Sequence, residues 1–181
     1  MTLANKRLIL GVTGSIAAYK AADLSRRLIE KKFKISVVMT KEAHKFITPL
    51  TFMGLTGEKV YTDLFDDDNS GEMPHIKLAQ DADILLIAPA TANVIGKLAH
   101  GLADDLLTCI AMATPAQILI APAMNVEMYK NKIVQENCAK LRKIGMKFIE
   151  PVDGKLACGM IGQGHIASED NIIKAVLQAV K

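Results

Sequence analysis

The hydrophobic positions of this chain follow two alternating patterns, short continuous apolar runs and longer segments in which apolar residues recur at helical spacing. The runs predict strands that are buried on both faces, and they cover 7–12, 34–39, 83–89, 117–122 and 146–150. The longer segments predict helices, and they cover 15–32, 41–56 with a break at Pro49, 75–81, 92–112, 126–144 and a last helix capped by Ser168. This alternation predicts an α/β fold, a doubly wound, Rossmann-like parallel sheet flanked by helices in a flavodoxin-like three-layer sandwich.

The chain length and the irregular segments set the expected organisation. A chain of 181 residues is most simply one domain, so we expect a single domain over 1–181. Two long segments, 66–74 and 151–167, show neither pattern. Long loops in compact domains are either functional or disordered, which makes both segments candidates for function.

Composition excludes several classes of function. The chain has 22 basic and 19 acidic residues and no basic stripe interleaved with aromatic residues, which argues against a nucleic-acid partner. The apolar stretch near the N-terminus is too short for a signal peptide or a membrane segment. Three cysteines without a C-x-x-C pair argue against a disulfide framework and against a zinc site. We therefore expect a cytoplasmic protein with reduced thiols and no membrane partner.

A glycine turn follows the first predicted strand in the segment GVTGSIAAYK. Gly11 and Gly14 lie in the turn, and a helix is expected to open at Ser15, where free N–H groups bind phosphate well. The spacing is G-x-x-G-x-x-A rather than G-x-G-x-x-G, and strand two ends in Thr40 and Lys41 rather than an acid. This pattern favours a mononucleotide over NAD and leaves NADP open. A plain tight turn without a ligand is the simpler alternative.

Two Ala-Pro steps end the predicted strands 83–89 and 117–122, in APATANV (88–94) and APAMNVEM (121–128). Each proline stops the strand, and the residues that follow are rich in hydroxyl and amide groups. Helix capping by Thr91 and by Asn125 is the plainer interpretation of either site alone. Because the two strands are expected to be neighbours beside the Gly14 turn, the pair favours a shared cleft at the carboxyl ends of the strands.

The remaining candidates for chemistry are a cysteine and a histidine. Cys158 lies in the glycine-rich polar stretch GKLACGMIGQGH (154–165), where neither a buried structural thiol nor a disulfide is expected. His75 follows Pro74 and opens a predicted helix. Taken alone, an incidental cysteine and an exposed histidine are the plainer interpretations. Four further residues are assigned no chemistry: Cys109, Cys138, His44 and His100.

The segments GVTGSIAAYK, PATANV, PAMNVEM and LACGMIGQGHIA occur in an order and spacing that resemble the flavin-containing cysteine decarboxylases. Within that family the chain is most similar to the phosphopantothenoylcysteine decarboxylases of coenzyme A synthesis, over nearly its whole length. It departs from the family at three positions. Val94 replaces a hydroxyl residue, Tyr129 replaces the usual Trp, and His165 stands where Arg is more frequent.

The resemblance implies an FMN enzyme with no metal. The residues expected to hold FMN are Gly14, Ser15, Ile16, Thr40, Thr91, Ala92, Asn93, Val94 and Ala123. The catalytic residues would be His75 as base, Asn125 as the ligand of the substrate carboxylate and Cys158 as proton donor. Lys155 and Ala157 would contact the substrate, together with Asn125, from a flap at about 151–167.

The implied reaction converts the small molecule phosphopantothenoylcysteine to 4'-phosphopantetheine without net oxidation. Loss of CO2 from a cysteine carboxylate leaves a carbanion with no electron sink, so the cysteine moiety is first oxidised, loses CO2 and is then reduced again. Members of the family assemble as homotrimers or as dodecamers of four trimers with the flavin between subunits, and we expect a similar homo-oligomer here.

Four alternatives remain open. The nearest is an oxidative decarboxylase of peptidyl C-terminal cysteine, although such relatives lack the ACG-x-x-G-x-G flap. A flavin-binding regulatory paralogue would be expected to lose His75, Asn125 or Cys158, all of which are present. A flavin prenyltransferase does not share the PAMN segment or the cysteine flap. An NADP dehydrogenase would carry no bound flavin.

Overall fold

Six parallel strands form the central sheet of the computed structural model, which describes residues 6–65, 73–155 and 161–180. The strands are β1 Arg7–Val12, β2 Lys34–Met39, β3 Val60–Tyr61, β4 Ile84–Ala90, β5 Gln117–Pro122 and β6 Lys147–Phe148. Their order in the sheet is β3-β2-β1-β4-β5-β6, so the chain reverses its direction of travel across the sheet between β1 and β4. Such a switch point is where ligands bind in doubly wound sheets.

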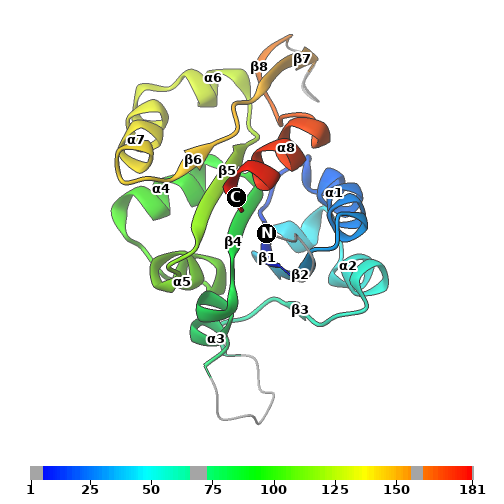
Figure 1. The fold of residues 1–181 in the computed structure, drawn as a ribbon. Coiled ribbons are helices and arrows are strands. Elements are labelled where there is room, and N and C mark those ends of the chain that lie inside the picture. Colours follow the sequence, from blue (N-terminus) through cyan, green and yellow to red (C-terminus); the bar gives the residue numbers. More distant parts are fainter. Residues whose placement is uncertain (1–5, 66–72, 156–160, 181) are drawn as a thin grey trace.

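Helices cover both faces of this sheet (Figure 1). They are α1 Ala18–Glu30, α2 Pro49–Thr56, α3 Pro74–Asp81, α4 Ala92–His100, α5 Leu106–Ala113, α6 Val126–Lys130, α7 Lys132–Lys143 and α8 Glu169–Ala179, with a 3-10 turn η1 at Ala43–Lys45. Side chains alternate between the faces along each strand. On β1, Leu8 and Leu10 join the core under α1, α2 and α8, whereas Ile9 joins the core under α3, α4, α5 and α7. The result is the predicted three-layer α/β sandwich.

The strand predictions are confirmed for the centre of the sheet and incomplete at its edges. Strands 7–12, 34–39 and 117–122 have the predicted bounds, and β4 is shifted by one residue from 83–89. The last predicted strand, 146–150, is reduced to β6. The apolar pattern does not predict β3, because a two-residue edge strand is too short to show a pattern.

Two of the helix predictions were wrong about continuity. The expected helix 92–112 is two helices, because Gly101 ends α4 in the left-handed region with φ of 69° and Asp105 caps α5. The expected helix 126–144 is also divided, because the side chain of Asn131 accepts a hydrogen bond from the Ile133 N–H and starts α7. The break at Pro49 and the cap at Ser168 are confirmed.

The segment 151–167 is not wholly irregular, contrary to the prediction. It contains two antiparallel strands, β7 Val152–Lys155 and β8 Ile161–His165, with Val152 opposite His165. They lie beyond the carboxyl end of β5 (Figure 1). Most of the other segment expected to be irregular, 66–74, lies outside the described residues. None of the helices in the part of the chain that the structure describes is long and apolar enough to cross a membrane.

Candidate functional site

Hydrogen bonds join the glycine turn and both Ala-Pro steps at one edge of the sheet. The fully buried hydroxyl of Thr13, directly after β1, donates to the Pro89 carbonyl at 2.7 Å and accepts from the Thr91 N–H at 3.1 Å. The Ala123 N–H donates to the Ala90 carbonyl at 3.0 Å and links the ends of β5 and β4. The predicted convergence of these segments is therefore correct. Thr13, which holds two of these segments together, is not among the residues predicted from the sequence.

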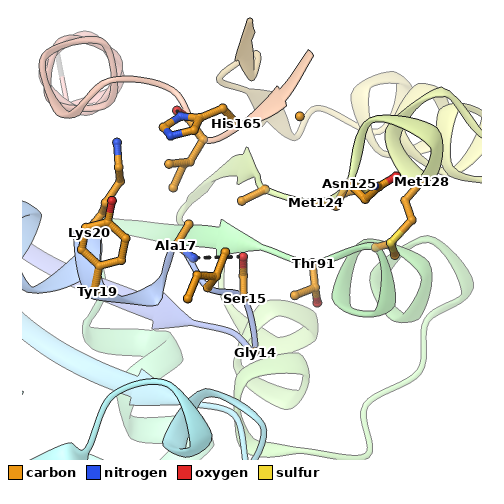
Figure 2. A pocket seen from close by; sticks show the side chains of 15 residues that line it. Gly14, Ser15, Ala17, Tyr19, Lys20, Thr91, Met124, Asn125, Met128 and His165 are labelled. Carbon is orange, nitrogen blue, oxygen red and sulfur yellow. Dashed lines mark hydrogen bonds between the residues drawn. The ribbon is translucent and has the colours of Figure 1, made fainter. Parts of the chain in front are cut away.

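A cavity of about 560 Å³ opens at this edge (Figure 2). Its lining comes from the glycine turn, the first turn of α1, the two Ala-Pro steps and the end of β8. The lining residues are Gly14, Ser15, Ile16, Ala17, Tyr19, Lys20, Thr91, Ala92, Ala123, Met124, Asn125, Met128, Gly164, His165 and Ile166. The volume lies within the range of about 300–1,000 Å³ that small-molecule and cofactor sites occupy.

A smaller cavity of about 200 Å³ adjoins the larger one. It is lined by Gly14, Thr40, Glu42, Thr91, Ala92, Asn93, Val94, Asp105 and Met128. The two cavities share Gly14, Thr91, Ala92 and Met128, so they form one continuous region around the start of α4 and the glycine turn. All nine residues expected to hold the cofactor line one cavity or the other.

The predicted catalytic and substrate residues are placed unequally. Asn125 lines the larger cavity, whereas His75 lines neither cavity. His75 lies on α3, which leads into the amino end of β4, and α3 is at the end of the molecule opposite β7 and β8 (Figure 1). Its Nδ1 atom is buried without a hydrogen-bond partner in the structure. Lys155 is the last residue of β7, and Ala157 and Cys158 lie outside the described residues.

The glycine turn differs from the expectation that a helix opens at Ser15. Residues 13–17 form a turn in which the Ser15 N–H donates to the Thr13 carbonyl at 2.8 Å, and α1 begins at Ala18. The Ser15 hydroxyl accepts weakly from the Ala17 N–H at 3.3 Å and lies at the cavity wall (Figure 2). Since α1 has no acidic side chain in its first turn, the positive end of its dipole faces this region without local neutralisation.

Asn125 is both a helix cap and a cavity residue. Its side-chain oxygen accepts from the Glu127 N–H at 2.8 Å at the start of α6, which confirms the capping interpretation. The NH2 end of the same side chain is a hydrogen-bond donor without a charge. Capping and ligand binding are therefore compatible at this residue, because they use opposite ends of the amide.

The β7–β8 pair is attached to the loop that carries Asn125. The Met124 N–H donates to the Gly164 carbonyl at 3.1 Å. A Cβ atom added at Gly164 would lie 2.5 Å from the Met124 carbonyl oxygen, and one added at Gly162 would lie 3.2 Å from the Val126 side chain. Glycine at position 164 therefore allows a backbone contact that any side chain would obstruct.

The two cavities differ in charge. Among the described lining residues, Lys20 and His165 are the basic side chains of the larger cavity. The Lys20 Nζ atom lies 3.6 Å from a Glu169 oxygen, and His165 Nδ1 lies 3.0 Å from the Ile166 carbonyl oxygen. The smaller cavity contains Glu42 and Asp105 instead.

Asp105 is held in its charged form. Burial by itself raises the pKa of this carboxyl group, but hydrogen bonds from Lys97 and from Thr108 outweigh it and lower the pKa below the ordinary value. No group of three or more His, Cys, Asp and Glu side chains is arranged to hold a metal ion in the ranges 6–65, 73–155 and 161–180.

Several lining residues were not identified from the sequence. Tyr19 and Lys20 could have been found from their position in the first turn of the helix after β1, which always begins at the carboxyl edge of the sheet. Met124, Met128, Gly164 and Ile166 carried no chemical signal of their own. Gly164 and Ile166 reach the cavity through the docking of β8 on the loop after β5, whereas Met124 and Met128 reach it from that loop and from α6.

Comparisons with known proteins identify the family. The model of the family described as Flavoprotein matches residues 1–181. The chain is 46% identical over 173 residues to a probable phosphopantothenoylcysteine decarboxylase of Streptococcus mutans, a match that covers 94% of this chain and 97% of that protein. It is 46% identical over 172 residues to the coenzyme A biosynthesis bifunctional protein CoaBC of Bacillus subtilis. That match covers 95% of this chain and 42% of the bifunctional protein, so the chain spans less than half of the longer relative.

Solved structures agree with this assignment. A PPC decarboxylase mutant complexed with pantothenoylaminoethenethiol superposes with a TM-score of 0.86 at 32% identity, over 96% of this chain and 97% of that one. The FMN-dependent cysteine decarboxylase SpaF superposes with a TM-score of 0.85 at 35% identity, over 99% of both chains. The matches confirm the resemblance that the motifs indicated, and the chain belongs to the Flavoprotein family.

Proposed function

We propose that this chain is an FMN-dependent phosphopantothenoylcysteine decarboxylase, which forms 4'-phosphopantetheine in coenzyme A synthesis. The observation that carries the proposal is the pair of adjoining cavities at the carboxyl edge of the sheet, where the nine residues expected to hold FMN gather beside Asn125. The names of the Streptococcus mutans relative and of the superposed PPC decarboxylase support the same activity. We infer a single catalytic domain over 1–181, in keeping with the extent of the family match.

The chemistry of the cavity walls fits FMN. Apolar side chains suited to a flat aromatic ring are Ile16, Ala92, Ala123, Met124 and Met128, and hydroxyl or amide side chains suited to a polar tail and phosphate are Ser15, Thr40, Thr91 and Asn93. A Cβ atom at Gly14 would lie 2.4 Å from the Glu42 Cβ, so the backbone of the turn lies close to the wall with no room for a side chain. When bound, FMN supplies reversible two-electron oxidation of the substrate.

Asn125 and the basic residues of the larger cavity have separate roles in binding. The Asn125 amide donates to the substrate carboxylate without adding a positive charge that would oppose the loss of CO2. Lys20 and His165 lie across the cavity from Asn125 (Figure 2) and attract the substrate phosphate. A phosphorylated substrate uses both sides of the cavity, which favours it over a peptidyl cysteine.

The proton-transfer residues are assigned by the resemblance. His75 accepts a proton in the first step, and Cys158 returns one at the end, from a flap that also brings Lys155 and Ala157 to the substrate. An ordinary cysteine thiol, with a pKa of about 8.5, is mostly protonated at neutral pH and can donate.

The position of His75 supports an active site that is formed by residues of two subunits. Because His75 lines neither cavity of its own chain, we infer that a neighbouring subunit supplies it in a homotrimer or in a dodecamer of four trimers. The apolar side chains of Phe46, directly after η1, and of Leu50, Met53 and Leu55, on α2, are exposed and suit a contact between subunits. We infer that the assembly works in the cytoplasm.

The proposal is tested with the purified protein. We expect a yellow protein whose released cofactor has the mass of FMN, and which converts phosphopantothenoylcysteine to 4'-phosphopantetheine with release of CO2. The Cys158→Ser variant should still release CO2 but leave the oxidised ene-thiol product, in about one equivalent per FMN without oxygen and in larger amounts where air reoxidises the flavin. The control Cys109→Ser should form the full product. Bound NADP in place of a flavin, or turnover of C-terminal cysteine peptides alone, would refute the proposal.

A further inference from the structure

A buried phenol connects the helix that begins at Asn125 to the chain that leads into β7. The Tyr129 side chain is 5% exposed, and its hydroxyl donates to Glu150 Oε2 at 2.8 Å. The other carboxylate oxygen, Oε1, accepts from Arg142 at 2.6 Å. The Arg142 guanidinium lies 4.4 Å from the centre of the Phe148 ring, so the acceptor itself is held by α7 and β6.

Tyr129 lies one helical turn after Asn125. Its N–H donates to the Asn125 carbonyl at 2.9 Å, so a shift at one residue moves the other. Helix α6 has five residues, too few to be stable without tertiary contacts. Val126 and Tyr129 are its buried residues, and two polar contacts hold the end of the helix: the Tyr129 hydroxyl bond and the bond that the Gln135 side chain donates to the Tyr129 carbonyl.

Glu150 joins two parts of the site. It lies two residues before β7, and β8, the partner of β7, is bonded to Met124 through the Gly164 carbonyl. The Tyr129–Glu150 bond therefore closes a ring of contacts that runs from Asn125 through α6 to Glu150, along β7 and β8, and back to Met124. Such a ring keeps the Asn125 side chain and the hairpin in one relative position.

We propose that Tyr129 is a positioning residue for decarboxylation, because its hydrogen bond to Glu150 holds Asn125 where the substrate carboxylate binds. The inference rests on the proposed function, in which Asn125 is the carboxylate ligand. Burial, together with the bond to Glu150, raises the pKa of Tyr129 to about 12, so the phenol stays protonated and donates this bond throughout the neutral range.

The decisive variant is Tyr129→Phe, which keeps the ring and removes the hydroxyl. We expect kcat/KM for phosphopantothenoylcysteine to fall about tenfold, because small displacements of a substrate ligand are costly. The dissociation constant for 4'-phosphopantetheine, which lacks the carboxylate, should stay unchanged. Tyr129→Trp, whose indole N–H can donate to Glu150, should restore most of the activity. In an Asn125→Ala background, Tyr129→Phe should cause no further loss.

A matched control and a readout without turnover complete the test. Tyr61→Phe, at the far edge of the sheet on β3, should leave kcat/KM unchanged. Hydrogen exchange of the amides of 124–131 in substrate-free protein should be faster in Tyr129→Phe than in wild type, which separates this inference from a failure of the proposed activity. If Tyr129→Phe does not fold, the Glu150→Ala variant, which removes the acceptor of the same hydrogen bond, is used in its place in every measurement. Equal losses in the wild-type and Asn125→Ala backgrounds, weaker product binding or unchanged exchange would each overturn the proposal.

Discussion

Two glycines of the larger cavity occupy positions where a side chain would overlap the facing wall. A Cβ atom at Gly164 would meet the Met124 carbonyl oxygen at 2.5 Å, and one at Gly14 would meet the Glu42 Cβ at 2.4 Å. Both distances are below the contact distance of real atoms, so a substitution must move backbone or a neighbouring element. The first glycine sets how closely β8 lies on the loop after β5, and the second sets the shape of the turn after β1.

Gly164→Ala should separate β8 from Met124. Overpacking of this kind costs about 1–3 kcal/mol, and because the displaced wall faces Asn125 we also expect kcat/KM to fall about tenfold or more. Thermal unfolding and steady-state kinetics measure the two effects. Gly154→Ala on β7 is the matched control, since its nearest neighbour would be the His165 side chain at an ordinary 3.5 Å. Equal behaviour of the two variants would contradict the contact.

Gly14→Ala should weaken FMN binding more than it weakens the fold. The turn must move away from Glu42, which changes the wall shared by both cavities. We expect a purified variant with less bound flavin, measured as the ratio of flavin to protein absorbance. Gly96→Ala, in α4 with the Asn137 side chain at an ordinary 3.8 Å from the added atom, should keep full flavin content. Full flavin content in Gly14→Ala would place the cofactor elsewhere.

The sequence predicted the location of most site residues because they follow strand ends, and strand ends are its clearest signal. Thr91 and Asn125 were found in this way, and the resemblance then supplied their roles. Thr13 was missed because an ordinary threonine carries no chemical signature before the fold places it between the ends of β1 and β4. Lys20 could have been found only from its position in the first turn of α1. For His75, the sequence indicated a role but not that the residue lies away from the cavities of its own chain.

The junction between α4 and α5 shows how two short helices replace the one that was expected. Asp105 caps α5, since its carboxylate accepts from the Thr108 N–H at 2.8 Å while the Thr108 hydroxyl accepts from the Asp105 N–H at 3.2 Å. The Lys97 Nζ atom on α4 lies 2.8 Å from the other Asp105 oxygen. The carboxylate therefore holds the end of one helix against the start of the next, beside the smaller cavity.

Asp105→Asn should reduce the free energy of unfolding in a manner that depends on pH. The folded-state pKa of Asp105 is lowered, so its stabilising contribution is complete above the unfolded pKa of about 3.9 and is lost as the pH falls through the folded pKa. We expect a loss of about 1–2 kcal/mol at pH 7, which shrinks as the pH falls below about 4. Urea unfolding of wild type and variant at several pH values measures this difference.

Asp104→Asn is the control for this prediction. Asp104 also contacts Lys97, at 2.7 Å, but its side chain is 64% exposed against 28% for Asp105. An exposed pair contributes at most about 1 kcal/mol, so Asp104→Asn should have the smaller effect. If the free energies of unfolding of wild type and Asp105→Asn differ by the same amount from neutral to acid pH, the lowered pKa of Asp105 would be contradicted.

The periodic apolar pattern could not predict where the helices break or that β7 and β8 pair. The apolar spacing of 92–112 runs through Gly101 without interruption, because α4 and α5 face the same core. The spacing of 126–144 likewise runs through Asn131. Single residues set the positions of the breaks: Gly101 and Asp105 between α4 and α5, and Asn131 before α7. Likewise, the glycine-rich composition of β7 and β8 concealed a hairpin whose strands pair through backbone atoms.

At the scale of the whole molecule, one proposed catalytic residue lies away from the others. The central sheet brings the residues proposed to bind cofactor and substrate to one edge, as its switch point predicts. The proposed base, His75, lines neither cavity at that edge. The proposed site between subunits accounts for both facts and for the exposed apolar side chains of α2.

Leu50→Asp should weaken self-association and activity together. Leu50 is 73% exposed, so a charge there is tolerated in the isolated chain but opposes burial against a neighbour. Sedimentation velocity should show a shift from the oligomer towards the monomer, with kcat falling in proportion. Ile133→Asp, on α7 and 67% exposed, should change neither. A fully active monomer would contradict the shared site.

The most direct test of the central claim is the number of turnovers per bound flavin without oxygen or any other electron acceptor. An enzyme that oxidises its substrate and later reduces it again needs no external acceptor. We therefore predict continued formation of 4'-phosphopantetheine and CO2 in equal amounts, far beyond one equivalent per FMN. Reaction that stops after one equivalent, with an oxidised ene-thiol product and reduced flavin, would contradict the account.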